Sequence, residues 1–255
     1  MKHLMTRLFA LAALALLALA APMAQAFEFS TMTDAERNAF RAEVRSYLME
    51  NPEVLLEAIK VLENRQAAQQ KTDDASLLKV NAEDIYNDGY SYIGGNPDGD
   101  VTLVEFSDYR CPYCRRAHPE VTELLKQDGN IRLIYKEYPI LGDASLTSSR
   151  FAIATMMVAG PEAYKKVSDA LIELRGEPSA EALKGIAEKF GLDAAEIALR
   201  MPGQEVTDII DKNHALGQRL RISGTPSFIL GDQFLRGYVP LADMQELVKQ
   251  LRAKK

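Results

Sequence analysis

The sequence predicts an α/β fold that carries an inserted helical subdomain and an N-terminal helical extension. Three observations predict it. A buried strand pattern over 101–107 leads into a helix pattern that starts at Cys111, and a second strand pattern follows over 131–137. Residues 143–221 then carry helical signals alone, before strand patterning returns at 227–230. Helical signals also precede the first strand.

The first 26 residues have the features of a secretory signal peptide. Lys2 and Arg7 precede an apolar run over 8–20, and a small-x-small cleavage motif ends at Ala26. The run is too short for a comfortable membrane span, and an uncleaved anchor or a buried helix is the alternative. We expect cleavage near Ala26, so that the mature chain begins near Phe27 and leaves the cytosol.

The charge balance excludes one class of partner. The chain has 36 Asp and Glu residues against 30 Lys and Arg residues. It has no Lys/Arg-rich run and no stripe of alternating basic and aromatic residues. We therefore expect no nucleic-acid partner and no electrostatic attraction to an anionic membrane surface.

The N-terminal segment, 27–75, is predicted to hold two helices. A capping box at 33–36 begins the first, and Asn51-Pro52 begins a second that runs to about residue 70. Apolar residues recur every three or four positions on the second helix, so that face must be covered. Docking on the chain's own domain and coiled-coil association with other copies both remain open. Residues 66–74 are interpreted as a polar continuation or a linker.

The remaining residues, 76–255, are predicted to form one domain around the strands, with the helical insert at about 143–221. The pattern over 77–93 is ambiguous and allows one edge strand. The later elements are a turn cluster at 94–100, a βαβ unit over 101–137, the insert, a hairpin over 227–239 and a final helix over 241–252.

Cys111 and Cys114 are the only cysteines of the chain. A thiol at a helix N-terminus faces unpaired N–H groups and the positive end of the helix dipole, and both favour the thiolate. We therefore expect a lowered pKa for Cys111, with Cys114 one turn away within disulfide reach. A purely structural disulfide is the alternative. It is disfavoured because so small a loop removes little entropy from the unfolded chain.

Gly224-Thr225-Pro226 directly precedes the returning strand. A proline there cannot donate a hydrogen bond to a neighbouring strand, so an edge or bulge position is indicated. An ordinary trans turn proline is the alternative.

Together these motifs resemble the DsbA-like family of exported thiol–disulfide oxidoreductases in the thioredoxin superfamily. The resemblance rests on VEFSDYRCPYC at 104–114, on the helical insert and on GTPSF at 224–228, and it covers about residues 95–255. Residues 47–55 are similar to the branch that contains ScsC, where an N-terminal helical segment can hold protomers in a trimer. The resemblance implies a thioredoxin fold, a periplasmic location, no cofactor and a homo-oligomer. It also implies a membrane redox partner and, as substrates, unfolded or misoxidised exported proteins.

The resemblance implies a role for each matching residue. Cys111 would be the attacking thiolate and Cys114 the thiol that resolves the mixed disulfide. Pro226 would be a cis-proline. Thr225 before it would tune the active-site disulfide, and its backbone would pair with substrate. Glu105 would be a buried acid that helps to move the proton of the resolving thiol, with a pKa raised by its apolar strand. An exposed strand-end acid is the alternative for Glu105.

The sequence departs from the family pattern between the cysteines. The strongly oxidising DsbA enzymes carry Pro-His there, whereas this chain carries Pro112-Tyr113, which cannot become cationic. We therefore expect a less oxidising disulfide, and isomerase or reductase activity rather than primary oxidase activity. Tyr113 and Tyr109 are interpreted as an apolar rim that holds substrate, beside Pro112. His118 stands where the best-known DsbA proteins have an acid.

Two other functions remain open. Cys111, Cys114 and His118 share a helix face, and two thiolates favour Cu(I) or Zn(II), but a closed zinc site needs a fourth ligand. No metal site is therefore assigned, and His118 is interpreted as a surface histidine. Copper binding by the same cysteines stays an alternative, as does a non-catalytic adaptor. Arg115 and Arg116 are interpreted as a solvated helix face.

Overall fold

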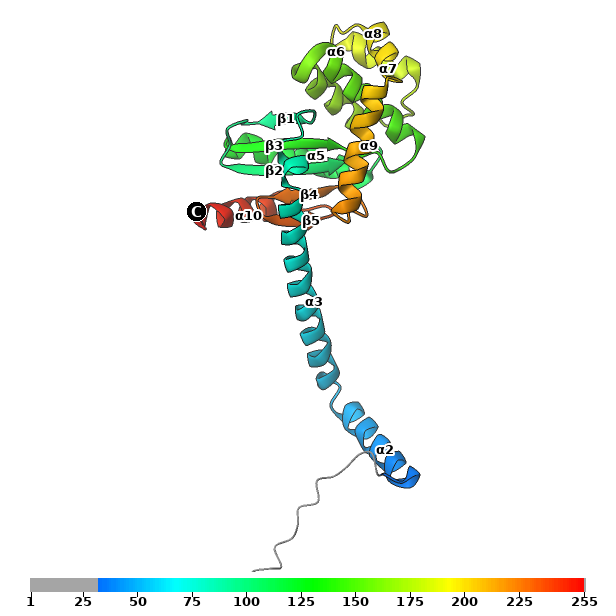
Figure 1. Ribbon diagram of the computed structural model, residues 1–255, viewed down its shortest axis with the longest axis vertical. Helices are drawn as coiled ribbons and strands as arrows, with labels where there is room; N and C mark the ends of the chain where they lie inside the picture. The colour runs from blue at the N-terminus through cyan, green and yellow to red at the C-terminus, as the bar shows by residue number, and fades with distance from the viewer. Residues whose placement is uncertain (1–31, 255) are drawn as a thin grey trace, which may run out of the picture. The chain divides into compact units, whose positions relative to one another are not determined.

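The computed structural model describes residues 32–254 (Figure 1). The predicted signal peptide, cleavage site and mature start lie outside the described residues. The chain divides into two compact units at residues 65 and 66, and each unit is described by itself. Among residues 32–254, no helix combines the length and the apolar character that crossing a membrane would require.

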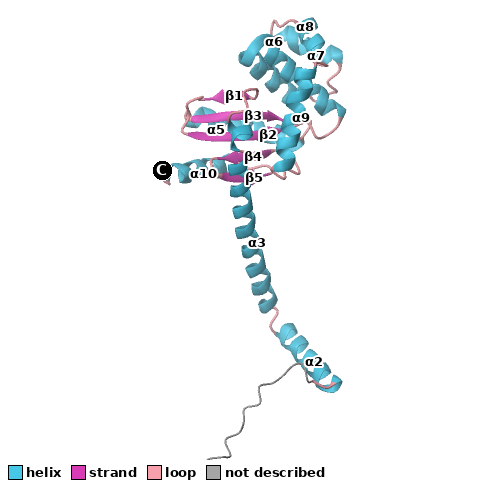
Figure 2. Cartoon of the chain, in the orientation of Figure 1, coloured by secondary structure: helices cyan, strands magenta, loops and turns pink. Residues whose placement is uncertain are grey.

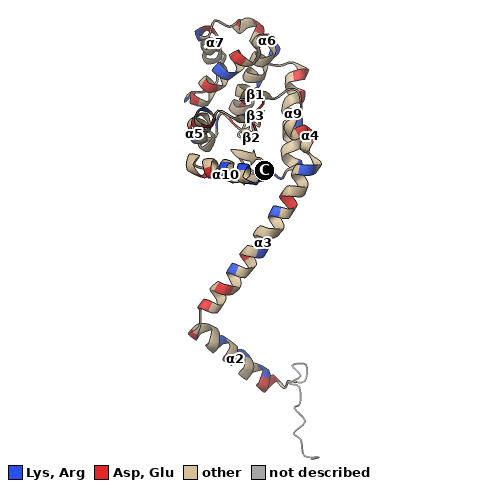
Figure 3. Ribbon diagram, turned by 90° about the vertical axis from the view of Figure 1, so that its left-hand side faces the viewer, with Lys and Arg blue, Asp and Glu red and all other residues tan. Residues whose placement is uncertain are grey.

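The first unit contains helix α2 (Asp34–Glu50) and the start of α3 (Glu53–Val80). The predicted capping box is present, because Thr33 Oγ1 accepts from the Glu36 N–H at 3.3 Å and the Glu36 carboxylate accepts from the Thr33 N–H at 2.9 Å. No side chain of α2 is buried. Figure 3 shows charges of both signs distributed along α2 and α3. Large apolar side chains are also exposed here: Phe40, Val44, Tyr47, Met49, Leu55, Leu56, Ile59, Val61 and Leu62.

Residues 66–80 belong to the second unit and continue α3 without a break, so the segment 66–74 is helix and not linker. Asp74 on this stretch pairs with Arg236 at 2.6 Å, and Leu78 is buried. The ambiguous stretch 77–93 contains the end of α3, the short helix α4 (Ala82–Tyr86) and the start of strand β1 (Tyr92–Gly95). The edge strand therefore forms only at its end.

The second unit is built on a five-stranded sheet with the order β1-β3-β2-β4-β5 (Figure 2). The other strands are β2 (Val101–Ser107), β3 (Ile131–Glu137), β4 (Ser227–Leu230) and β5 (Gln233–Arg236). The central pair, β2 and β3, is parallel, and the other pairs are antiparallel. The predicted βαβ unit and hairpin are therefore both present.

Helices cover both faces of the sheet. Alternate residues of β2 face opposite sides, as strand geometry requires. Leu103 packs in the cluster with α5 (Pro112–Asp128) and α10 (Leu241–Ala253), while Val104 packs against α4 and α9 (Gln204–Arg219). Because Glu105 and Ser107 share the face of Leu103, both side chains point toward α5.

The helical insert contains α6 (Asp143–Glu173), α7 (Ala180–Lys189), α8 (Ala194–Arg200) and α9, close to the predicted 143–221. Gly160 has a φ of 78° and marks a kink between two helical stretches of α6. The Ser179 and Asp193 side chains cap α7 and α8, because they accept from backbone N–H groups in the first turns of these helices.

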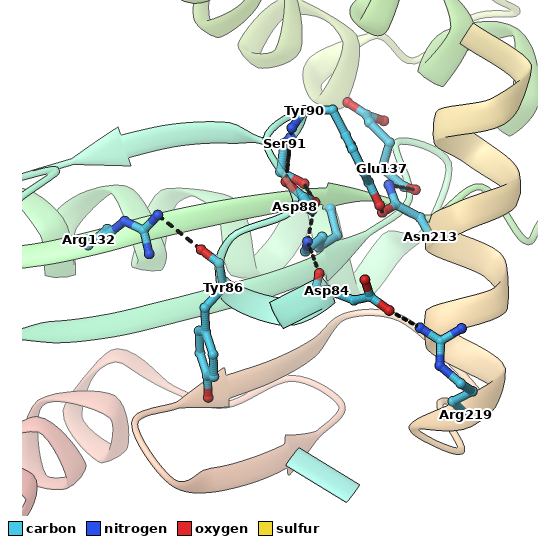
Figure 4. A network of polar contacts seen from close by, with 10 residues as sticks. Asp84, Tyr86, Asp88, Tyr90, Ser91, Arg132, Glu137, Asn213 and Arg219 are labelled. Atoms are coloured by element: carbon cyan, nitrogen blue, oxygen red, sulfur yellow. Dashed lines mark hydrogen bonds and ion pairs between the residues drawn. The ribbon is translucent and has the colours of Figure 1, made fainter. Parts of the chain in front are cut away.

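A buried ion pair fastens the loop between α4 and β1 to the sheet (Figure 4). The Lys136 ammonium is fully buried on β3 and pairs with Asp88. It also donates to the Asp84 carbonyl at 2.8 Å, and the Asp84 carboxylate pairs with Arg219 of α9 at 2.5 Å. These partners satisfy a charge that would otherwise be costly to bury.

Candidate active site

Cys111 is the N-cap of α5 and directly follows the turn after β2. Asp108 shapes this turn, because its carboxylate accepts from the Arg110 N–H at 2.8 Å and from the N–H groups of Ile140 and Leu141 at 2.8 and 3.1 Å. The Asp108 carbonyl also accepts from the Cys111 N–H at 3.1 Å. Asp108 was not singled out from sequence, although an acid in a turn after a strand is a common backbone acceptor.

The Cys111 thiol is 5% exposed and has a pKa lowered to about 5. The largest cause is a hydrogen bond with the Cys114 thiol, and the N–H groups of Cys114 and Tyr113 at the helix start add to it. Burial raises the pKa and a hydrogen bond with the Thr225 side chain lowers it, and the lowering contacts outweigh burial. When protonated, the thiol donates to the Thr225 carbonyl at 3.1 Å. Cys111 is therefore a thiolate at neutral pH, as its position predicts.

Cys114 is fully buried one helical turn further on. Burial is the largest cause that raises its pKa, and the hydrogen bond with Cys111 raises it further. Both cysteines are free thiols in the structure. The pair therefore combines one nucleophile that is ionised at neutral pH with one thiol that must lose a proton before it can attack.

The loop before β4 lies against the cysteines. The peptide bond between Thr225 and Pro226 is cis, as expected, and Pro226 is buried. The Pro226 carbonyl accepts from the Gly237 N–H at 3.0 Å, and the Ser227 hydroxyl donates to the Gly224 carbonyl at 2.9 Å. The Thr225 backbone is thus held beside the Cys111 sulfur.

Glu105 is a buried acid and not an exposed strand-end residue. Burial raises its pKa to about 7, while the charge of His118 and a hydrogen bond with Ser107 act in the opposite direction. The Ser107 hydroxyl also hydrogen-bonds Cys114, where it lowers the pKa of the thiol. Ser107 therefore stands between the acid and the resolving cysteine, a role that the sequence did not reveal.

The two tyrosines near the motif lie in different environments. Tyr113 is 60% exposed, beside the exposed Pro112, in agreement with a surface position at the site. Tyr109 is fully buried, so its predicted place in a substrate-holding rim is wrong. Its hydroxyl donates to Glu137 at 2.7 Å and accepts from the Ser168 hydroxyl at 3.0 Å, which draws the ring into the core.

Glu137 is the centre of this buried network. Its carboxylate accepts from the hydroxyls of Tyr109 and Tyr164 at 2.7 and 2.6 Å and from Ser149 at 2.7 Å. Burial raises its pKa to about 7 although these donors lower it. Its backbone carbonyl accepts from Asn213 at 3.0 Å, and Tyr90 donates to that same amide at 3.2 Å (Figure 4). The network joins β3 to α6 and α9 beneath the active-site turn.

Arg115 is not part of a solvated face, which corrects the sequence interpretation. Its guanidinium donates to the carbonyls of Ile172 and Leu174 at 2.7 and 3.1 Å. Arg110 donates to the Leu174 and Gly176 carbonyls at 3.2 and 2.8 Å. Orphan carbonyls at a helix end attract such donors, so the end of α6 is fixed beside Cys111. Arg116 is exposed and stacks on the Tyr238 ring at 4.3 Å.

His118 lies one turn beyond Cys114 and is partly buried rather than a free surface residue. Its Nε2 is 3.0 Å from Asp169 Oδ1 of α6. Within residues 32–254, no group of three or more His, Cys, Asp or Glu side chains is arranged to hold a metal ion.

Family models match both parts of the chain. A model described as Thioredoxin matches residues 87–250, and one described as the copper resistance protein ScsC N-terminal domain matches residues 36–69. Sequence search also matches two Na⁺/H⁺ antiporters from Salinispora arenicola and Salinispora tropica, at 30% and 27% identity. The chain spans about a fifth of the length of these curated relatives, 21% in each case.

Solved structures resemble most of the chain. A thioredoxin-like oxidoreductase from Silicibacter pomeroyi is 40% identical with a TM-score of 0.62, over 67% of this chain and 97% of that one. The thiol-disulfide exchange protein α-DsbA2 from Wolbachia pipientis is 26% identical with a TM-score of 0.67, over 72% and 98%. Proteus mirabilis ScsC in a transitional conformation is 26% identical with a TM-score of 0.64, over 89% and 100%.

Proposed function

Because the chain belongs to the thioredoxin family, whose model spans residues 87–250, we propose that it is a thiol–disulfide oxidoreductase acting on protein disulfides through Cys111 and Cys114. One observation carries the proposal. The thiol at the start of α5 has a pKa lowered to about 5, and a buried second thiol lies one turn away. Thiolates are the nucleophiles of disulfide exchange, so Cys111 is ready to react at neutral pH.

In the proposed mechanism, the Cys111 thiolate attacks a substrate disulfide and forms a mixed disulfide, releasing a substrate thiolate. If another substrate thiol resolves it, the substrate disulfide is isomerised. If Cys114 resolves it, the substrate is reduced and a Cys111–Cys114 disulfide forms. The reverse sequence oxidises substrate dithiols. The Thr225 backbone beside Cys111 is placed to pair with an extended substrate segment, and exposed Tyr113 offers an apolar contact.

We favour isomerase or reductase activity over primary oxidase activity. Tyr113 cannot supply a positive charge near the Cys111 thiolate, which limits how far the dithiol form is stabilised. Assembly of several active sites around one substrate would also favour isomerisation. A DsbA-type dithiol oxidase is the alternative.

Self-association is supported by the exposed apolar side chains of the first unit. Leu55, Ile59 and Leu62 follow one another at four and three residues on α3, and each is about half exposed. The ScsC N-terminal model covers this same stretch. We propose that this face packs against other copies of the chain, as a trimer or another homo-oligomer.

Location and partners follow from the leader pattern and the chemistry. The charged start, apolar run and small-x-small motif of residues 1–26 favour export to the periplasm. Unfolded or misoxidised exported proteins would be the substrates there, and a membrane redox partner would reset the disulfide.

A copper-related function is the second candidate, favoured by the family model of the N-terminal segment. Two thiolates are suitable Cu(I) ligands. Copper that stays bound after the thiols are oxidised would favour a dedicated site, whereas loss of copper on oxidation would not discriminate.

The activity is tested with the mature chain from Phe27 and two matched assays, isomerisation of a scrambled-disulfide substrate and oxidation of a reduced one. Isomerisation by the wild type that is lost in Ile59→Asp would support an oligomeric isomerase. Fast oxidation without isomerisation would make the chain an oxidase. Cys111→Ser should abolish both activities. An in vivo function that survives this substitution would instead indicate a non-catalytic adaptor.

A further inference from the structure

The loop that carries the cis-proline lies between two arginines that contact the same short stretch of α3. Arg221 precedes the loop, and Arg236 of β5 is the ladder partner of Ser227, the first residue after the loop. The acidic partners of the two arginines, Asp73 and Asp74, are neighbours on α3. Both ends of the loop are therefore connected to one place on this helix.

The pair between Arg236 and Asp74 is the stronger of the two contacts. The guanidinium donates two hydrogen bonds to the carboxylate, at 2.8 and 2.6 Å. The arginine side chain is 31% exposed and the aspartate side chain 14%, so water screens the pair only in part. The guanidinium also lies over the Phe234 ring, 4.1 Å from its centroid. Because a bidentate pair fixes orientation as well as distance, Asp74 holds the Arg236 side chain in one position.

Backbone hydrogen bonds connect Arg236 to the active site. The next residue, Gly237, donates its N–H to the Pro226 carbonyl at 3.0 Å. The Thr225 carbonyl, directly before this proline, lies 3.1 Å from the Cys111 sulfur. A displacement of β5 at Arg236 is therefore passed to the backbone that faces the nucleophile.

The start of the loop is held by a residue in an unusual backbone conformation. Arg221 follows α9 with a φ of 56°, and among residues 32–254 only glycines share a positive φ with it. Glycine usually occupies this position after a helix, because a Cβ atom is strained there. The Arg221 guanidinium lies 3.9 Å from Asp73, and the flanking Leu220 and Ile222 belong to the same buried cluster as Leu78 of α3. The strained residue thus contributes a side chain that contacts α3.

We propose that the stretch of α3 with Asp73 and Asp74 positions the cis-proline loop for substrate, through Arg221 on one side and Arg236 on the other. This inference rests on the proposed thiol–disulfide exchange. It goes beyond that function because it assigns the placement of the substrate-pairing backbone to residues outside the active site. The two acids and the two arginines are positioning residues, since each acts through the loop.

The proposal predicts that peptide substrates depend on these ion pairs more than small disulfides do. An extended peptide needs the Thr225 backbone in register with the Cys111 sulfur, whereas a disulfide without peptide groups needs only the sulfur. Reduced mature protein is therefore mixed, in a stopped-flow instrument, with 5,5′-dithiobis(2-nitrobenzoate) or with a short peptide whose single cysteine carries thionitrobenzoate. In each first step the Cys111 thiolate bonds to one sulfur of the disulfide, and thionitrobenzoate leaves with the electron pair. The ratio of the two second-order rate constants isolates the contribution of the peptide backbone.

The ratio is measured for the wild type, Asp74→Asn, Arg221→Asn and the exchanged pair Asp74→Arg/Arg236→Asp. Asparagine tolerates the left-handed conformation, so Arg221→Asn removes the charge and keeps the backbone. Asp128→Asn is the matched control. Asp128 also accepts two hydrogen bonds from one arginine, Arg252, both at 2.7 Å, and is likewise 14% exposed, but it lies at the far end of α5 from the cysteines.

We expect Asp74→Asn to lower the peptide rate constant by about threefold, within the range for one partly exposed ion pair, while the rate constant with the small disulfide equals that of Asp128→Asn. Arg221→Asn should lower it less, because its pair is more exposed. The exchanged pair should recover the peptide rate constant, since it restores the contact with reversed charges.

Three results would overturn the positioning role: a ratio in Asp74→Asn equal to that of Asp128→Asn, an equal loss with both disulfides, or no recovery in the exchanged pair. A wild type that reacts slowly with both disulfides would instead overturn the proposed exchange itself.

Discussion

The acidity of Cys111 is predicted to depend on the neighbouring thiol, and replacing Cys114 tests this directly. The pKa of Cys111 falls from 9.0 to about 5, with the Cys114 hydrogen bond as the largest cause. Because the pKa of Cys111 is lowered in the folded state, the thiolate adds to the free energy of unfolding. This contribution is complete above about pH 9 and is lost as the pH falls through about 5. At pH 7, two units above the lowered pKa, it is worth about 3 kcal/mol. The same energy favours the dithiol over the disulfide by about 60 mV.

The assay is the pH profile of Cys111 alkylation by iodoacetamide. Cys114→Ala removes the donor, while Cys114→Ser keeps a hydroxyl donor of similar size, and both variants retain Cys111 as the single cysteine. We expect the midpoint of Cys114→Ala to rise by at least about one pH unit and that of Cys114→Ser to stay closer to the wild type. Circular dichroism confirms that both variants are folded. Equal midpoints near pH 5 would refute the reasoning and would assign the acidity to the helix N-terminus alone.

Three further outcomes are expected. Unfolding in urea should show that Glu105→Gln gains stability relative to the wild type between pH 5 and pH 8, by up to about 3 kcal/mol. The reason is that the pKa of the buried wild-type carboxyl is raised to about 7, so the wild type loses unfolding free energy as the pH rises. A difference that does not change with pH would contradict this. Tyr109→Phe should cost about 1–2 kcal/mol of unfolding free energy, since it leaves Glu137 one buried donor short, while the Cys111 alkylation midpoint stays unchanged; an unchanged melting temperature would count against this role. Ile59→Asp should lower the sedimentation coefficient of the mature protein, and a wild type that already sediments as a monomer would exclude the proposed assembly.

Local patterns were sufficient to predict the central part of the fold. The strand over 101–107, the helix that begins at Cys111 and the hairpin after Pro226 each carry a strong periodicity or a turn signal, and all three are present. Strand β1 was only weakly indicated because four residues with two glycines carry no clear alternation. Residues 66–74 were ambiguous because a polar sequence suits both a solvated helix and a linker.

The site was predicted where its chemistry lies within one motif and missed where it depends on distant contacts. The thiol pair follows from adjacent residues, and the cis-proline position was implied by the family resemblance of the motifs. Glu137 meets Tyr109, Ser149 and Tyr164 across separations of 28, 12 and 27 residues, so no local signal announces their hydrogen bonds. The same contacts explain why Tyr109 was misplaced at the surface: its ring is apolar enough for a rim, but its hydroxyl has a buried acceptor.

The arginines on either side of the cysteine motif have a mechanical consequence. Together Arg110 and Arg115 donate four hydrogen bonds to the carbonyls at the end of α6 and just beyond it. These bonds therefore tie the end of α6, the first helix of the insert, to the reactive turn and to the start of α5. If the insert rearranges around a bulky substrate, the bending must occur elsewhere, and the glycine kink at residue 160 is the natural pivot. The space open to large substrates can then change while the distance between Cys111 and the Thr225–Pro226 loop stays constant.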